Sequence, residues 1–105
     1  MGYAREVIGA FEADGLPVIG LTYEEKVKLW AFAFPTRRGN VFVGLSDILP
    51  GTLLVSVIVR QESVGIREFD LPDEGDGPRE ERVLALAKKV MDHLCESLSK
   101  VGMVQ

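Results

Sequence analysis

The chain has 105 residues, a hydrophobic fraction of 47% and a formal net charge of −4. This length and composition indicate one folded domain, residues 1–105, and exclude a disordered chain. An acidic balance disfavours general attraction to nucleic-acid phosphates or to anionic membranes. The single cysteine favours a reducing compartment. No apolar run approaches the ~20 residues that a membrane span needs, so we expect a cytoplasmic protein.

The first predicted element is an amphipathic helix over residues 3–14. Its apolar residues recur at helical spacing, and Gly15, followed closely by a proline, ends it. Residues 18–21 are short and apolar, and the pattern allows either an edge strand or a connector there. A polar turn then leads into the first well-defined strand.

Three strands follow, each apolar on both faces, and a fourth has a weaker pattern. They are predicted over residues 26–34, 40–46, 52–60 and about 64–71. The turns between them are short, which favours an antiparallel meander. An acidic, glycine-rich linker separates the last strand from the C-terminal helix.

The C-terminal helix has the clearest signals in the chain. Pro78 and two glutamates mark its start, and Lys100 and Gly102 mark its end. A broad apolar stripe runs along it. The predicted fold is therefore α+β, with an N-terminal helix, an antiparallel meander of about four strands and a long C-terminal helix packed on one sheet face.

The strand register follows from the assumed turns. A five-residue turn at 35–39 places Phe34 opposite Asn40, and Trp30 then lies opposite Gly44. Pairing of Ser46 with Thr52 continues the same pattern. All odd-numbered side chains then share an aliphatic face, and the other face carries four aromatic side chains, which are Trp30, Phe32, Phe34 and Phe42.

The aromatic face is the candidate functional surface. The small aliphatic side chains let the C-terminal helix approach closely, so this helix is expected on the aliphatic face. The N-terminal helix either lies beside it, leaving the aromatic face open, or crosses to the other side. Three uses of the aromatic face remain: an interface with a second copy or another protein, an internal core, or a ligand or nucleic-acid surface. The last use draws on nearby basic residues, namely Lys26, Lys28 and Arg37.

No catalytic or metal-binding arrangement is recognisable. His93 and Cys95 are two positions apart on a helix and cannot form a dyad, so His93 is expected to be solvated or at a rim and Cys95 to be a core residue. The acidic residues of the linker do not match a calcium loop. We therefore expect a non-enzymatic protein that needs no cofactor or metal.

The order of elements is loosely similar to that of small dimeric secretion-chaperone-like domains. That resemblance implies a dimer that binds extended client segments, although residues 46–51 replace the helix expected between the middle strands. The leading hypothesis is a homodimeric binding or regulatory module that uses the aromatic face. A nucleic-acid or small-ligand binder using the same face is the alternative, and a chaperone-like client binder is another.

Overall fold

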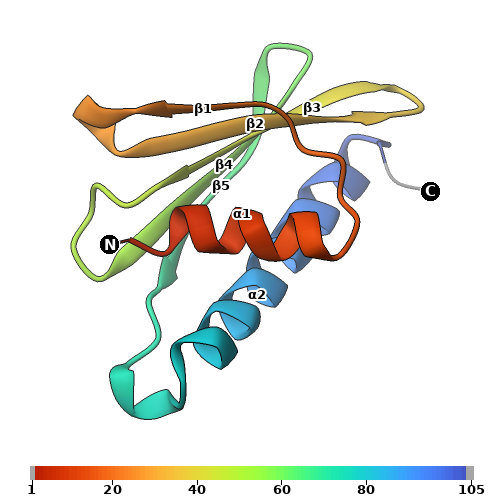
Figure 1. The fold of residues 1–105 in the computed structure, drawn as a ribbon. Coiled ribbons are helices and arrows are strands. Elements are labelled where there is room, and N and C mark those ends of the chain that lie inside the picture. The colour runs from red at the N-terminus through yellow and green to blue at the C-terminus, as the bar shows by residue number, and fades with distance from the viewer. Residues whose placement is uncertain (1, 104–105) are drawn as a thin grey trace.

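The computed structural model describes residues 2–103 and folds into an α+β domain of two layers, a sheet and a pair of helices (Figure 1). The helices are α1 (Ala4–Ala13) and α2 (Arg79–Lys100). The strands are β1 (Ile19–Glu24), β2 (Leu29–Thr36), β3 (Gly39–Ser46), β4 (Thr52–Val59) and β5 (Glu62–Asp70). Two short 3-10 turns are η1 (Glu25–Val27) and η2 (Glu74–Asp76). The predicted fold class is confirmed.

The sheet is an antiparallel meander in which the strands lie in chain order, β1-β2-β3-β4-β5. It has five strands where about four were predicted. The additional strand is β1, so the stretch that allowed two interpretations is an edge strand, and it pairs with β2.

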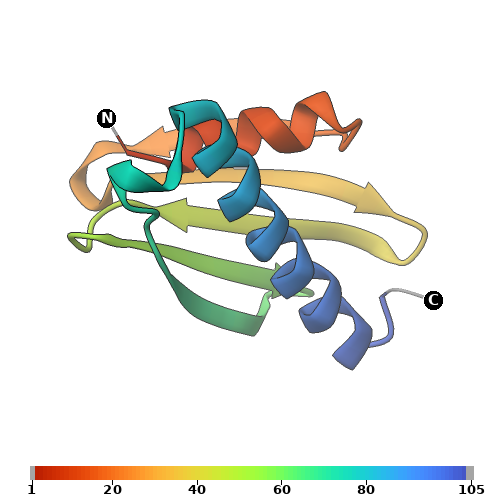
Figure 2. The ribbon, with the colours of Figure 1, turned by 90° about the horizontal axis from the view of Figure 1, so that it is seen from below.

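Both helices cover the same side of the sheet (Figures 1 and 2). Helix α1 packs over β2, and α2 crosses the strands obliquely to pack over β4 and β5. The long C-terminal helix therefore packs on one sheet face, as predicted. The N-terminal helix lies beside it, and no described element covers the opposite side of the sheet.

The hydrophobic core lies between the helices and the sheet. The odd-numbered side chains of β3 and β4 point into it and are at most 3% exposed, as the alternating sequence predicts. They are Val41, Val43, Leu45, Leu53, Val55, Val57 and Val59. Apolar residues of both helices close the core from the other side, among them Ile8 and Phe11 of α1 and Leu86 and Leu94 of α2.

Polar contacts anchor α1 at both the sheet and α2. Tyr3 offers no capping side chain, and the Asp47 carboxylate instead accepts hydrogen bonds from the backbone N–H groups of Tyr3 (3.2 Å) and Ala4 (3.3 Å). A carboxylate at this position also favours the helix dipole. Arg79 of α2 forms an ion pair with Glu6 of α1. The helix pair is thereby fixed over one side of the sheet.

The β2–β3 turn is shorter than predicted, and the expected register is wrong by one residue. Thr36 pairs with Gly39, leaving a turn of only two residues. The Thr36 hydroxyl closes it by donating to the Gly39 carbonyl (2.6 Å) and accepting from the Arg38 N–H (3.1 Å). Phe34 therefore lies opposite Val41, not Asn40. A slip of one residue exchanges the two faces of a strand relative to its neighbour.

The β3–β4 register also differs from the prediction, but this difference does not exchange the two faces of the strand. Ser46 pairs with Leu54, two residues from the predicted partner Thr52. Because side chains alternate with period two, a shift of two residues keeps every side chain on its predicted face. The aliphatic character of the covered side of β3 and β4 is therefore unaffected.

Both outer strands of the sheet are irregular. The pairing of β1 with β2 shifts between Ile19 and Thr22, where Gly20 has a φ of +63°. The pairing of β5 with β4 shifts between Val57 and Ile58. These irregularities bend the two edges of the sheet. Among the described residues, no helix is both long and apolar enough to cross a membrane.

Candidate functional site on the open side of the sheet

The register change divides the four predicted aromatic residues between the two sides of the sheet. Phe32 and Phe34 are 2% and 8% exposed and belong to the core, and Trp30 is partly buried on the same side. Phe42 lies on the opposite side and is 50% exposed. The expectation that these side chains form one uncovered aromatic face is therefore wrong. Even-numbered residues of β2 meet odd-numbered residues of β3.

The predicted basic residues are also separated. Lys26 lies in η1 and Lys28 directly after it, at one end of β2, whereas Arg37 lies in the turn at the other end. An eight-residue strand spans roughly 26 Å. The structure thus brings Lys28 near Trp30 but does not bring Arg37 near either of them. The expected basic rim around one aromatic surface is not present among these residues.

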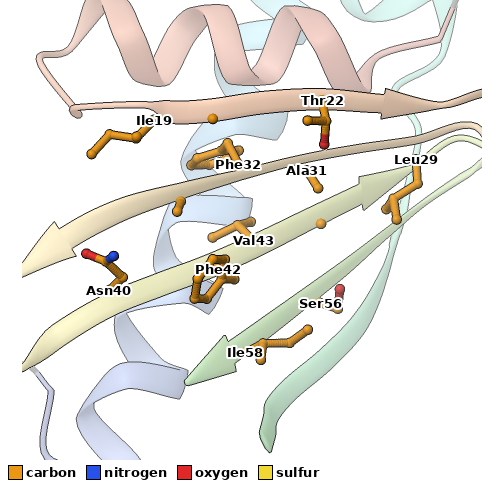
Figure 3. A pocket seen from close by; sticks show the side chains of 13 residues that line it. Ile19, Thr22, Leu29, Ala31, Phe32, Asn40, Phe42, Val43, Ser56 and Ile58 are labelled. Atoms are coloured by element: carbon orange, nitrogen blue, oxygen red, sulfur yellow. The ribbon is translucent and has the colours of Figure 1, made fainter. Parts of the chain in front are cut away.

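The uncovered side of the sheet is nevertheless strongly apolar, and we call it the open face. It is formed by side chains from all five strands, namely Ile19, Thr22, Leu29, Ala31, Ala33, Asn40, Phe42, Gly44, Leu54, Ser56, Ile58, Ile66 and Glu68. Figure 3 shows Phe42, Ile58 and Leu29 around its centre. Four large apolar side chains are exposed there: Ile19 (51%), Phe42 (50%), Ile58 (37%) and Ile66 (64%).

Strand pairing arranges the open face in rows across the sheet. One row runs through Ile19, Ala33, Phe42 and Ile58, and ends near Ser63. The next row consists of Thr22, Ala31, Gly44, Ser56 and Ile66. Neither row contains a charged residue. Charged residues lie at the margin, where Glu68 pairs with Leu54 and Glu24 pairs with Leu29.

The row of small residues forms a hollow of about 490 Å³ in the open face (Figure 3). Ala31, Gly44 and Ser56 form its floor between the larger side chains of Leu29, Phe42 and Ile58. A Cβ atom on Gly44 would lie 2.9 Å from the Ser56 Oγ and 3.1 Å from the Leu29 Cδ1. The Ser56 hydroxyl and the Leu29 side chain therefore close the space directly over Gly44, and the hollow lies among these side chains and the Phe42 ring.

Sequence reasoning identified Phe42 but not the isoleucines around it. Ile58 and Ile66 fall on the open face only through the pairing of β3, β4 and β5. The alternation of β4 predicts that Ile58 points to the face away from the valines of the same strand. This pattern could have identified Ile58. Ile66 had no such signal, because charged neighbours interrupt the pattern of β5.

A second hollow lies at the end of the sheet, between η1 and the start of α1, and has a volume of about 570 Å³. Tyr23 and Trp30 form a directly opposed pair there, with ring centroids 4.7 Å apart and ring planes at 38°. The Arg5 guanidinium lies 5.8 Å from the centre of the Trp30 ring. Lys28, Glu6 and Asp47 also line this hollow. No sequence pattern pointed to Tyr23 or Arg5.

The predictions for His93 and Cys95 are both wrong. His93 is 7% exposed and lies against Phe69, whereas Cys95 is exposed. Gly65 makes room for α2 at this point, since a Cβ there would overlap the Ser97 hydroxyl. The oblique path of α2 turns His93 toward β5 and Cys95 away from it. His93 Nε2 is buried and has no hydrogen-bond partner.

The surroundings of His93 favour its neutral form. Burial lowers the pKa of His93, and the positive charges of Arg67 and Lys100 lower it further, with Glu96 acting in the opposite direction. His93 and Ser97, one turn apart on α2, are both buried where the helix lies against Gly65 of β5. Among residues 2–103, no carboxylate is found in a hydrogen bond with this ring, as a catalytic triad would require.

The described residues 2–103 include no group of three or more His, Cys, Asp or Glu side chains that could hold a metal ion. Comparison with protein families, with curated proteins and with solved structures finds no match to this chain. The open face and the hollow beside Trp30 are therefore the two features of the chain that bear on its function.

Proposed function

We propose that this chain is a non-enzymatic binding module that forms a homodimer through the open face. The observation that carries this proposal is the pair of uncharged rows at the centre of that face. Four exposed large apolar side chains lie in these rows. Contiguous exposed apolar surface on a small domain is typical of a protein interface.

The size of the open face fits a dimer. Strands about 4.8 Å apart and about eight residues long at ~3.4 Å per residue give five strands a footprint of roughly 600 Å². Each partner of a standard interface contributes about 800 Å² of accessible surface, which a footprint with projecting side chains approaches. A second copy of the same face therefore offers an area of the right size.

Charge and shape favour a second copy as the occupant. The chain carries a net charge of −4, which opposes association in general, but the two central rows bring no like charges together. In a twofold dimer the same patch meets itself. The Phe42 ring of each copy can then lie against the hollow in the open face of the other.

The same geometry weakens the nucleic-acid alternative for this surface. Single-strand binders combine stacking rings with cationic side chains along one groove. The open face has one aromatic ring and, among the described residues that form it, no lysine or arginine. A chaperone-like client would occupy the same apolar rows, and it is a distinct outcome of the experiment below. The exposed free thiol of Cys95 supports the proposal of a reducing, cytoplasmic setting.

The test is the mass of the protein in solution. Size exclusion with light scattering is expected to give about 23 kDa, twice the mass of the 11.5 kDa chain. Phe42→Asp combined with Ile58→Asp is expected to give the monomer, because a buried unpaired carboxylate is costly at an interface. Leu84→Asp is the control, since Leu84 is 53% exposed on α2, outside the open face.

Two results would contradict the proposal. A wild-type chain that stays monomeric up to high micromolar concentration would exclude a homodimer and favour a foreign partner such as an extended client. A dimer that Leu84→Asp disrupts and the open-face double variant does not would move the interface to the helices.

A further inference from the structure

The hollow beside Trp30 has the properties of a small-ligand site. Its volume of about 570 Å³ lies within the ~300–1,000 Å³ range of ligand pockets. Such pockets combine apolar and aromatic walls with a few convergent polar groups. Here β1 and β2 supply two aromatic rings, α1 supplies two charged side chains, and the residues that follow η1 and β3 supply two more.

The aromatic wall offers a surface for a planar ring. Tyr23 is 47% exposed although it pairs directly with Trp30, so part of its ring faces solvent. Rings stack readily on such surfaces at offset or tilted geometry. Trp30 is partly buried and packs against the hydrophobic core, which restricts its movement. The aromatic wall thus consists of one ring packed on the core and one ring accessible to solvent.

Of the four charged side chains that line the hollow, three are engaged with other groups of the chain. The Asp47 carboxylate already accepts two backbone hydrogen bonds at the start of α1, and the Glu6 carboxylate pairs with Arg79. Arg5 pairs with Glu12 at 3.2 Å but extends over the Trp30 ring. Among the described residues, Lys28 takes part in none of the ion pairs. An anion would find a free ammonium group beside the aromatic wall.

We propose that this hollow binds a small planar aromatic anion. The ring of the ligand lies against Tyr23 and Trp30, and its carboxylate or phosphate contacts the Lys28 ammonium. Stacking on aromatic side chains is a main source of affinity in proteins that bind single-stranded nucleic acids. A hydrogen bond to a charged group adds a further contribution. The site is separate from the open face and does not depend on the dimer.

Lys28 also provides a variant that leaves the fold intact. Its backbone has a φ of +47°, in the left-handed region that asparagine and glycine adopt more readily than lysine. Lys28→Asn therefore removes the charge while relieving backbone strain. Lys26→Asn is the matched control, because Lys26 belongs to the same turn but does not line the hollow.

The experiment uses the emission of Trp30, the single tryptophan of the chain. Adenosine monophosphate and salicylate are titrated as a planar phosphate and a planar carboxylate, with adenosine as the uncharged control. At least one anion is expected to change the emission saturably, and adenosine is expected to bind about tenfold more weakly. Lys28→Asn is expected to weaken binding of that anion about tenfold, and Lys26→Asn to leave it within twofold.

Two outcomes would overturn this proposal. One is the absence of a saturable response to either anion at millimolar concentration. The other is an equal loss in Lys26→Asn and Lys28→Asn, which would indicate general charge attraction rather than a site. The Phe42→Asp and Ile58→Asp double variant is expected to bind the anion like the wild type, so failure of the dimer is distinguished from failure of the ligand site.

Discussion

The two sides of the sheet have similar chemistry and opposite surroundings. The covered side of β3 and β4 consists of valines and leucines that the two helices bury almost completely. The open side carries Phe42, Ile58 and Ile66, which are equally apolar and at least 37% exposed. Hydrophobic residues on both faces of an antiparallel sheet require two layers of cover. The described residues supply one such layer, and this difference is the reason for proposing a second copy of the chain as the other.

The largest expected difference in stability comes from replacing one phenylalanine on each side of the sheet. Phe32→Ala is expected to lower the free energy of unfolding by about 3–5 kcal/mol, because the ring is buried in the core. Phe42→Ala is expected to lower it by only about 0.5 kcal/mol, because the ring is half exposed. The free energies of unfolding are measured by urea denaturation of the two variants. Both also carry Ile58→Asp, so that self-association does not contribute. Equal losses would mean that Phe42 is also a core residue.

Two glycines give a smaller but sharper comparison. Gly65→Ala places a methyl group into Ser97, between β5 and α2, and is expected to cost about 1–3 kcal/mol of stability. Gly44→Ala displaces only the mobile ends of Leu29 and Ser56, so stability is expected to stay within about 0.5 kcal/mol. Because it displaces two side chains that line the hollow in the open face, it is expected to weaken the proposed self-association. Thermal denaturation and light scattering separate the two effects.

The buried histidine makes the covered side sensitive to pH. The folded state lowers the pKa of His93 below the value of 6.5 that applies when the chain is unfolded. Above pH 6.5 the group is neutral in both states and has no effect. As the pH falls below 6.5, the unfolded chain takes up a proton that the folded chain resists, so stability falls until the folded group also titrates.

His93→Gln is expected to remove this part of the pH dependence. The difference in unfolding free energy between wild type and variant is measured at pH 8 and at pH 5, which cancels the titration of groups common to both. The wild type is expected to lose more stability than the variant on acidification. A difference that does not change with pH would show that His93 titrates alike in both states. The open face contains no comparable group, so self-association is expected to respond less.

The smallest effect concerns a turn that belongs to neither face. Gln61 lies between β4 and β5 with a φ of +66°, which favours glycine. Gln61→Gly is expected to stabilise the fold by about 0.5 kcal/mol while leaving the association constant unchanged. A change in association would mean that stability and self-association are coupled through the whole domain and not confined to the open face.

The sequence predicts most of the fold. It does not predict the register of β2 against β3, because this depends on the number of residues in the turn between them. In β3 and β4 the alternation identifies the core side, because the odd-numbered side chains are aliphatic throughout. In β2 both the odd-numbered and the even-numbered side chains are apolar, with Ala31 and Ala33 on one side and Phe32 and Phe34 on the other. The burial pattern therefore cannot choose between a two-residue and a five-residue turn. The hydrogen bonds of Thr36 that close the shorter turn form only in the folded hairpin.

The same limit applies to the candidate site. Phe42 and Lys28 could be selected from their residue types, but their separation depends on the register of β2. The positions of His93 and Cys95 depend on the angle at which α2 crosses the strands. A broad apolar stripe is compatible with several such angles. The aromatic pair of Tyr23 and Trp30 depends on β1, whose short sequence allowed two interpretations.

The irregular outer strands limit how far this protein can assemble. A flat, regular edge invites backbone pairing with another chain, and repeated pairing of that kind produces fibrils. Gly20 disturbs the pairing of β1, and charged residues such as Arg67 and Glu68 occupy the edge strand β5. Association is thereby directed to the face, where a twofold contact consumes the apolar surface of both copies. If the open face forms the proposed dimer, the irregular edges would leave no further surface for the assembly to grow.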